Sequence, residues 1–278
     1  MNILEFSLLV CIGSFMAGFL GSLTGLGGGV VIVPLLTSVF GVDIRYAIGA
    51  SLVSVIATSC AAASTYIKKG YTNLRLGMFL EVATITGALI GALIASFISV
   101  KALTVVLAIV LLYSAYLSGK PKEEHTDTHS PDPIATNLRL NSTYPNAEGL
   151  MSYQVNSVPA GFSIMLIAGV LSGLLGIGSG AFKVLAMDQA MGLPFKVSTS
   201  TSNFMIGVTA AASTGVYLAW GYIEPGLTMP VMLGVLPGAL LGAKVLVGAK
   251  THILRSIFSV VLVLMSLKMV YNSLAGGF

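Results

Sequence analysis

The stretch LTGLGGGVVIVP, residues 23–34, places four glycines within five positions of an otherwise apolar run. Glycine costs a helix interior about 1 kcal/mol relative to alanine, so a helix running through this stretch would be weakened there. The arm that follows, residues 30–40, spans about 17 Å as a helix, which is only half a bilayer. The sequence therefore predicts an apolar helical segment that breaks at the glycines.

The composition is that of an integral membrane protein. Of the 278 residues, 55% are hydrophobic and 9% are charged, and the mean hydropathy is +0.93. Soluble domains carry about 25% charged residues, so a soluble fold is excluded. We expect the lipid bilayer as the main partner, and no nucleic acid.

The glycine stretch recurs 151 residues later as LLGIGSGAFKVL, residues 174–185. At this constant offset the matched pairs include Gly25 and Gly176, Gly27 and Gly178, Gly29 and Gly180, Ser51 and Ser202, Gly87 and Gly238, and Gly91 and Gly242. Two homologous halves joined by a polar segment are typical of many transporters. We therefore divide the chain into a first membrane repeat (1–118), a polar linker (119–157) and a second membrane repeat (158–278).

The linker has four prolines, with three basic and five acidic residues, so we expect it to lie outside the membrane, in the cytoplasm. Each repeat is predicted to hold a glycine-broken segment and three transmembrane helices, which makes the fold an all-α polytopic membrane protein. The predicted segments are 3–40, 46–67, 74–98 and 102–118, then 160–192, 197–219, 227–248 and 252–274.

The direction of the second repeat depends on the broken segments. If each crosses the membrane once, the repeats are parallel; if each is a re-entrant hairpin, every half crosses three times and the second half is inverted. With Lys68, Lys69 and Arg75 in the cytoplasm, inverted repeats place nine basic residues inside and three outside, against seven and five for parallel repeats. The positive-inside rule therefore favours the inverted arrangement.

The two glycine loops form the candidate substrate site. As hairpins they would approach the bilayer centre from opposite faces, and freed backbone amides at helix N-termini suit a small anion. The loop candidates are Thr24, Gly25, Gly27, Gly28, Gly29, Gly176, Gly178, Ser179 and Gly180, and the helices that follow add Ser51, Thr199, Thr201, Ser202 and Asn203. Tight helix packing is the alternative for the loop glycines, and Gly87-xxx-Gly91 and Gly238-xxx-Gly242 are interpreted as packing motifs.

Lys183 stands three positions after Gly180, where the first repeat has Ile32. A cation near a helix N-terminus opposes the helix dipole, so an anionic ligand would satisfy both, and pairing with Asp188 is the structural alternative. Asp188 and Glu81 are candidate coupling or charge-pair residues, although Glu81 could instead pair with Arg75 near the surface. We predict no catalytic residue, metal ligand or cofactor.

The duplicated glycine motif resembles that of a known family. AGFLGSLTGLGGGVVIVPLL (17–36), its copy AGVLSGLLGIGSGAFKVLAM (168–187) and the STSTSN run (198–203) resemble the TauE/SafE sulfite exporter family of membrane permeases. The resemblance implies a secondary transporter, not an enzyme, that moves a small sulfur-containing anion such as sulfite or an organosulfonate across the inner (cytoplasmic) membrane. It also implies protons as the candidate coupling ion.

Other functions stay open at this point. The chain could be a permease for another small anion or for a metal cation, although Lys183 and the scarcity of membrane carboxylates disfavour a cation. A membrane thiol redox protein using Cys11 and Cys60 is a further alternative. The anion, the direction of transport and the oligomeric state are left open, and alternating access would follow if the two repeats rocked against each other.

Overall fold

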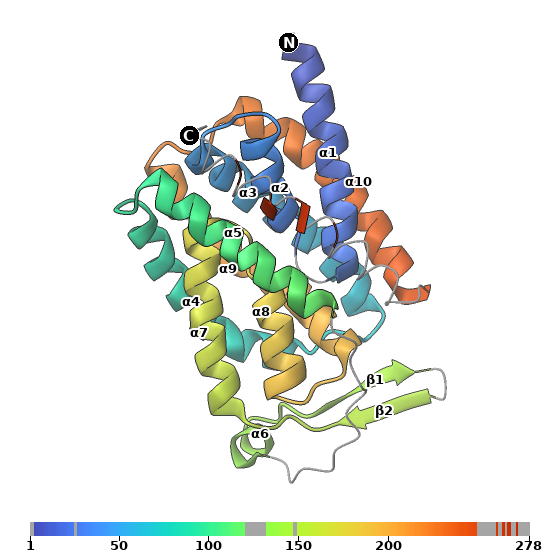
Figure 1. Ribbon diagram of the computed structural model, residues 1–278. Helices are drawn as coiled ribbons and strands as arrows, with labels where there is room; N and C mark the ends of the chain where they lie inside the picture. Colours follow the sequence, from blue (N-terminus) through green and yellow to red (C-terminus); the bar gives the residue numbers. More distant parts are fainter. Residues whose placement is uncertain are drawn as a thin grey trace.

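The computed structural model describes residues 3–24, 27–119, 132–146 and 149–248, with single positions between 260 and 271 (Figure 1). The first half holds α1 (Ile3–Thr24), α2 (Gly29–Ser38), α3 (Ile44–Lys68), α4 (Leu74–Ala95) and α5 (Val100–Gly119). The linker holds α6 (Pro133–Asn137), β1 (Ser142–Asn146) and β2 (Gly149–Tyr153). The second half holds α7 (Val158–Leu175), α8 (Gly180–Leu185), the π-helix η1 (Ala186–Ala190), α9 (Phe195–Ala219) and α10 (Pro225–Gly248).

Five helices in the described part of the chain are long and apolar enough to cross a bilayer. These helices are α1, α3, α4, α7 and α10. The predicted all-α polytopic membrane fold is confirmed. Most of the predicted last helix, residues 252–274, lies outside the described residues.

The helix boundaries recur at the offset of the sequence repeat. Residues 44–68 of α3 become residues 195–219 of α9 when shifted by 151 positions. Turn glycines recur as well: Gly27 and Gly178 have φ values of 78° and 73°, and Gly70 and Gly221 have φ values of 75° and 73°. Only glycine adopts these angles without steric cost, so both halves turn the chain at equivalent glycines.

Each glycine-broken segment is a helical hairpin. The Phe6 ring at the start of α1 lies 5.3 Å from the Phe40 ring just after α2, so the segment returns to the end from which it started. At the turn, Gly27 N donates to Gly21 O at 3.3 Å. In the second half, Asn156 N donates to Met191 O at 3.0 Å and closes the base of the hairpin formed by α7, α8 and η1. The chain folds back at both glycine loops, as the re-entrant alternative predicts; whether these hairpins re-enter or cross the membrane stays a prediction.

The helices α3 and α9, which are repeat copies of each other, pack in opposite directions. At one end of the pair Arg45 Nη1 donates to the Tyr222 hydroxyl at 3.2 Å, and at the other end Asn73 N donates to Thr201 Oγ1 at 3.0 Å. In Figure 1, α1 descends from the marked N-terminus, whereas α7 rises from beside the strands. The two copies therefore run antiparallel, which is the relation that inverted repeats predict; the inverted arrangement and the cytoplasmic face stay predictions.

The closest helix pairs join the two halves. A Cβ atom built at Gly87 or Gly91 of α4 would overlap the backbone oxygens of α7, and one at Gly238 or Gly242 of α10 would overlap those of α1. The two pairs, α4 with α7 and α1 with α10, are exchanged by the repeat. The packing role predicted for both Gly-xxx-Gly motifs is confirmed.

The described part of the linker is docked on the membrane helices. Asn73 Nδ2 donates to Leu140 O at 2.8 Å and to the Tyr153 hydroxyl at 2.9 Å. Ala135, Leu140, Tyr153 and Val155 are buried in one cluster with residues of α4, α7 and α9. The linker thus has an apolar underside, and it covers the end of the molecule where α3 ends and α9 begins.

Candidate functional site

The two glycine loops meet inside the molecule. Ser51 Oγ of α3 donates to Gly176 O of the second loop at 2.7 Å. A Cβ atom built at Gly29 would lie 2.9 Å from Gly176 O and 2.7 Å from Ser51 Oγ, so only glycine fits at that position. The contact joins one loop to the other across the repeat, because Gly29 follows the first break and Gly176 begins the second. A substrate role of the loops stays a prediction.

The loops are closed around apolar side chains. Ile206 of α9 lies against both loops: its Cγ2 would be 3.3 Å from a Cβ atom at Gly27 and 2.7 Å from one at Gly178. Val55 of α3 packs against Gly29 and Gly178 as well. Ile206 and Val55 were not among the predicted site residues, since apolar residues give no signal in an apolar chain. The described residues of the two loops are therefore in contact with each other and with these apolar side chains.

The polar run of α9 has several different partners. Ser202 Oγ donates to Gly180 O at 3.4 Å, and Asn203 Nδ2 donates to Ser22 O at 3.4 Å, so both residues hold loop or hairpin backbone. Thr201 instead accepts the bond from Asn73 N, and it positions the start of α4. Thr24 is the last residue of α1, and Gly25 lies outside the described residues.

Two buried hydroxyl groups of the candidate set have no hydrogen-bond partner in the part of the chain that the structure describes. They belong to Ser179, 1% exposed, and Thr199, which is fully buried. Ser179 also has a left-handed backbone, with φ of 47°, whereas its counterpart in the first repeat, Gly28, has φ of −63°. A buried hydroxyl without a partner is costly, and a non-glycine residue in this conformation is strained. Backbone strain of this kind is frequent at ligand sites, whereas six further buried hydroxyls outside the candidate set also lack partners among the described residues.

Lys183 is the buried charge of the second hairpin. Its side chain is fully buried, and its Nζ donates to Thr209 Oγ1 of α9 at 2.5 Å. The same Nζ lies 3.9 Å from Glu81 Oε2 of α4. Thr209 Oγ1 in turn donates to Glu81 Oε1 at 2.5 Å, so the hydroxyl bridges the ammonium and the carboxylate.

Both sequence-based pairings of these charges are wrong. The ion pair of Lys183 is with Glu81 and not with Asp188, which is buried in η1. Glu81 is only 3% exposed and points into the molecule, so it does not reach Arg75. Sequence proximity suggested these pairs, whereas the packing of α4 on α7 and α9 brings Glu81 to Lys183.

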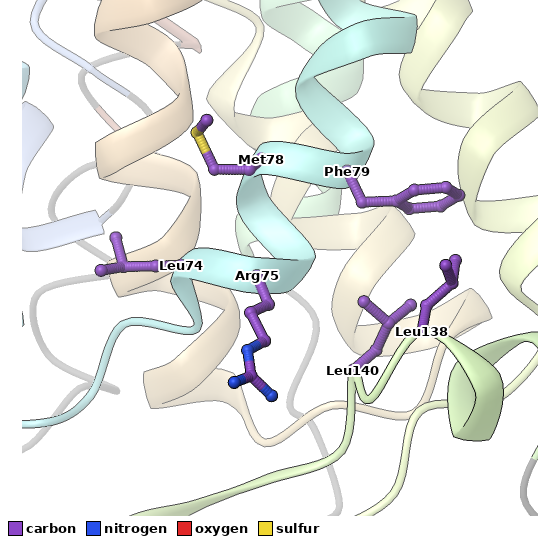
Figure 2. Close-up of a pocket in the computed structure, with 6 residues that line it drawn as sticks. All are labelled: Leu74, Arg75, Met78, Phe79, Leu138 and Leu140. Carbon is purple, nitrogen blue, oxygen red and sulfur yellow. The ribbon is translucent and has the colours of Figure 1, made fainter.

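Arg75 lies at a separate surface cavity. The cavity has a volume of about 410 Å³ and lies between the start of α4 and the linker. Figure 2 shows Leu138 and Leu140 of the linker beneath Phe79, with the Arg75 side chain beside them. None of the residues that line it belongs to the candidate site.

The charge pair breaks the internal symmetry of the protein. At the repeat offset, Lys183 corresponds to Ile32, Thr209 to Thr58 and Glu81 to Met232. The location related by the repeat, formed by Ile32, Thr58 and Met232, thus keeps the threonine and has no charged side chain. A buried ion pair costs desolvation energy that apolar residues would avoid, and the repeat shows an apolar solution within the same chain.

Thr209 is a site residue that the sequence analysis missed. Thr209 gives no signal of its own, but the charges that it bridges do: Glu81 is the single charged residue of residues 76–100, and Lys183 is the single basic residue of residues 158–195. A lone acid and a lone base in apolar segments are expected to pair, because each is expensive alone.

Comparison with known proteins assigns this sequence to a family. The model of the family described as sulfite exporter TauE/SafE matches residues 10–269. The chain belongs to the TauE/SafE family. The resemblance seen in the duplicated glycine motif is confirmed.

Relatives of this TauE/SafE protein cover nearly its whole length. The probable membrane transporter protein YunE of Bacillus subtilis (strain 168) is 29% identical, over 98% of this chain and 99% of its own. YdhB of the same organism, also a probable membrane transporter protein, is 27% identical over 85% of this chain and 89% of its own. ORF9 of Sinorhizobium sp, also a probable membrane transporter protein, is 23% identical over 97% of this chain and 95% of its own. No solved structure matches the chain significantly.

The family and these names identify a multi-pass membrane transporter of the TauE/SafE type. The family description names sulfite, whereas the relatives' names give no substrate.

Proposed function

We propose that this TauE/SafE protein is a secondary permease that moves a small sulfur-containing anion, such as sulfite or an organosulfonate, across the cytoplasmic membrane. The observation that carries the proposal is Lys183, a fully buried cation in the second glycine hairpin. An ammonium group has three N–H donors, and one hydrogen bond from Nζ is found among the described residues. A buried cation with donors to spare suits an anionic ligand.

Neighbouring polar groups support an anion site. The hydroxyls of Ser179 and Thr199 are buried and lack partners among the described residues, so each can donate to a ligand oxygen. Ser179 begins the helix that carries Lys183. Sulfite and sulfonate groups present three oxygens, which suits a cation together with several hydroxyl donors.

The basic residues support an orientation in the membrane. Lys68, Lys69, Arg75, Arg139 and Lys196 lie at the end of the molecule that carries the linker, because α3 ends and α9 begins there. Arg45 and Lys101 lie at the opposite end of the first half. By the positive-inside rule the linker faces the cytoplasm. Transport would then be driven by an ion gradient, with protons as the candidate coupling ion.

The test compares two lysines. Lys183→Ala should weaken anion binding and flux about 10- to 100-fold, because a hydrogen bond from a charged group contributes about 1.5–3 kcal/mol. Lys244→Ala, at an exposed position of α10, should change them little. The measurement is binding and flux of purified, reconstituted protein with sulfite, thiosulfate, methanesulfonate and small carboxylates.

Equal, small effects of the two substitutions would remove Lys183 from the site. Binding of carboxylates alone would assign another class of anion, and transport of a divalent metal would assign a cation permease. Because Lys183→Ala leaves Glu81 buried without its cation, folding is checked with Lys183→Ile combined with Glu81→Met. That double variant copies the side chains of the other repeat, Ile32 and Met232, and should remain monodisperse in detergent.

A further inference from the structure

Glu81 has an unusual set of contacts for a buried carboxylate. Oε1 accepts a hydrogen bond from Thr209, whereas Oε2 has no hydrogen-bond partner among the described residues and lies 3.9 Å from Lys183 Nζ. A 3.9 Å separation is an ion pair without a hydrogen bond. One oxygen of Glu81 is therefore available to take a proton while the other keeps its bond to Thr209.

We propose that Glu81 is the site of the coupling proton, and that it competes with the transported anion for Lys183. The inference rests on the proposed function, since it requires that Lys183 bind the anion. It goes further because it assigns the coupling proton to one carboxylate. It also states that this carboxylate must be protonated when the anion binds Lys183.

The competition follows from the number of charges. Lys183 supplies one positive charge in a buried location, and that charge balances either the Glu81 carboxylate or a singly charged anion. With both present, the site would hold a net buried negative charge, which is strongly unfavourable. Uptake of one proton by Glu81 Oε2 removes this charge, so binding of one anion is accompanied by uptake of one proton.

The proton is conserved through the cycle. It comes from water on the side to which the site is open, adds to Oε2, and returns to water when the anion leaves on the other side. Lys183 then pairs again with the Glu81 carboxylate, which leaves the empty transporter without an uncompensated buried charge. Anion and proton thus travel together in the same direction.

Few other charged groups face Glu81 in the described part of the chain. The helix α7 has no titratable residue, and α9 has its two titratable residues, Lys196 and Tyr217, near its two ends. On its own helix, Arg75 is six positions away at the surface. Asp188 in η1 is the other buried carboxylate near the second hairpin, and it is therefore the matched control.

The repeat indicates one coupling site in each chain. The counterpart of Glu81 is Met232, and the counterpart of Lys183 is Ile32, so the symmetric location carries no proton site. One proton per anion is the expected ratio.

The first experiment uses the unmodified protein. Methanesulfonate is added to purified protein in weak buffer with a pH-sensitive dye; this anion carries a single negative charge and, unlike sulfite, takes up no proton near neutral pH. We expect uptake of about one proton per bound anion, and apparent affinity that falls by up to about tenfold per unit rise in pH, because binding and protonation are linked.

The second experiment compares two isosteric variants. Glu81→Gln keeps an oxygen for Thr209 and mimics the protonated carboxyl group, so it should bind the anion with no pH dependence. In vesicles it should exchange anion for anion, yet a proton gradient should no longer drive accumulation. Asp188→Asn should keep both the pH dependence and the accumulation.

The outcomes separate the two proposals. If the unmodified protein binds and transports none of the anions, the proposed function fails. If it binds the anion without proton uptake, or if Glu81→Gln keeps pH-dependent binding and proton-driven accumulation, the coupling role of Glu81 is overturned. Loss of coupling in Asp188→Asn alone would also overturn it. If Glu81→Gln does not fold, proton uptake by the unmodified protein decides.

Discussion

Gly91 shows how a single hydrogen atom in place of a side chain permits a helix contact. A Cβ atom at Gly91 would overlap the backbone oxygen of Val170 on α7, and backbone atoms cannot move aside as a side chain can. We expect Gly91→Ala to lower the free energy of unfolding by about 1–3 kcal/mol, as overpacking does in close-packed interiors. Thermal unfolding in detergent, followed by fluorescence-detected gel filtration, measures the effect.

Gly215 of α9 provides the matched control. A Cβ atom there meets nothing within 4 Å, and the residue is also inside a helix. Gly215→Ala should be neutral or stabilising by up to about 1 kcal/mol. If the Gly91→Ala and Gly215→Ala variants unfolded at the same temperature, the result would contradict the close backbone contact between α4 and α7.

For single residues, the sequence indicated which charged side chains belong to the candidate site. It did not indicate which residues these side chains contact. Lys183 and Glu81 are identifiable as isolated charges in apolar segments. Their pairing depends on how α4 packs against α8 and α9, and the spacing of residues along the chain carries no information on that. Ile206 and Thr209 could not be predicted, because nothing distinguishes them from other apolar residues and hydroxyls of α9.

Among the elements, the linker has a prediction of its own. Asn73 caps α4 by accepting from Leu76 N at 3.1 Å, and its amide also holds Leu140 and Tyr153 of the linker. Asn73→Ala should therefore loosen the linker as well as the start of α4. Limited proteolysis and hydrogen exchange of residues 132–157 should both become faster.

Asp43→Ala serves as the comparison. Asp43 caps α3 by accepting from Arg45 N at 2.8 Å. Either substitution removes a cap worth about 1 kcal/mol. Only Asn73→Ala should raise exchange in the linker, and an equal response in both variants would show that Asn73 does not hold it.

The hairpins were predictable and the linker fold was not. An apolar arm of eleven residues after a glycine cluster is too short to cross a bilayer, so a hairpin was a physical alternative from the start. The predicted helix ends lie within three residues of those observed in the described part of the chain. The linker is polar in composition, and its buried residues form an apolar underside only after β1 pairs with β2.

For the whole molecule, the inverted arrangement predicts which positions share a face. Lys69→Cys and Lys196→Cys should react from one side of the membrane, and Lys101→Cys and Glu224→Cys from the other, since all four positions are exposed. The measurement is labelling of intact cells with a membrane-impermeant thiol reagent. Parallel repeats would instead group Lys196→Cys with Lys101→Cys.

The cysteine-free protein that the labelling requires also tests the thiol redox alternative. It requires Cys11→Ser and Cys60→Ser, which removes both free thiols. We expect anion flux to be unchanged in this background, and loss of activity would favour the thiol redox alternative.

The exchanged pairing of long helices changes what can move. The helix α1 packs on α10, and α7 packs on α4, through backbone contacts. Each half of the chain is therefore held to the other by two close helix pairs. A rocking motion between the two sequence halves would have to separate both of these helix pairs. The helices α3 and α9 also meet across the two halves, where the Ser59 hydroxyl donates to Asn203 O and accepts from Gly207 N. We therefore expect α1 to move with α10, and α7 to move with α4, so that each moving unit contains helices of both halves.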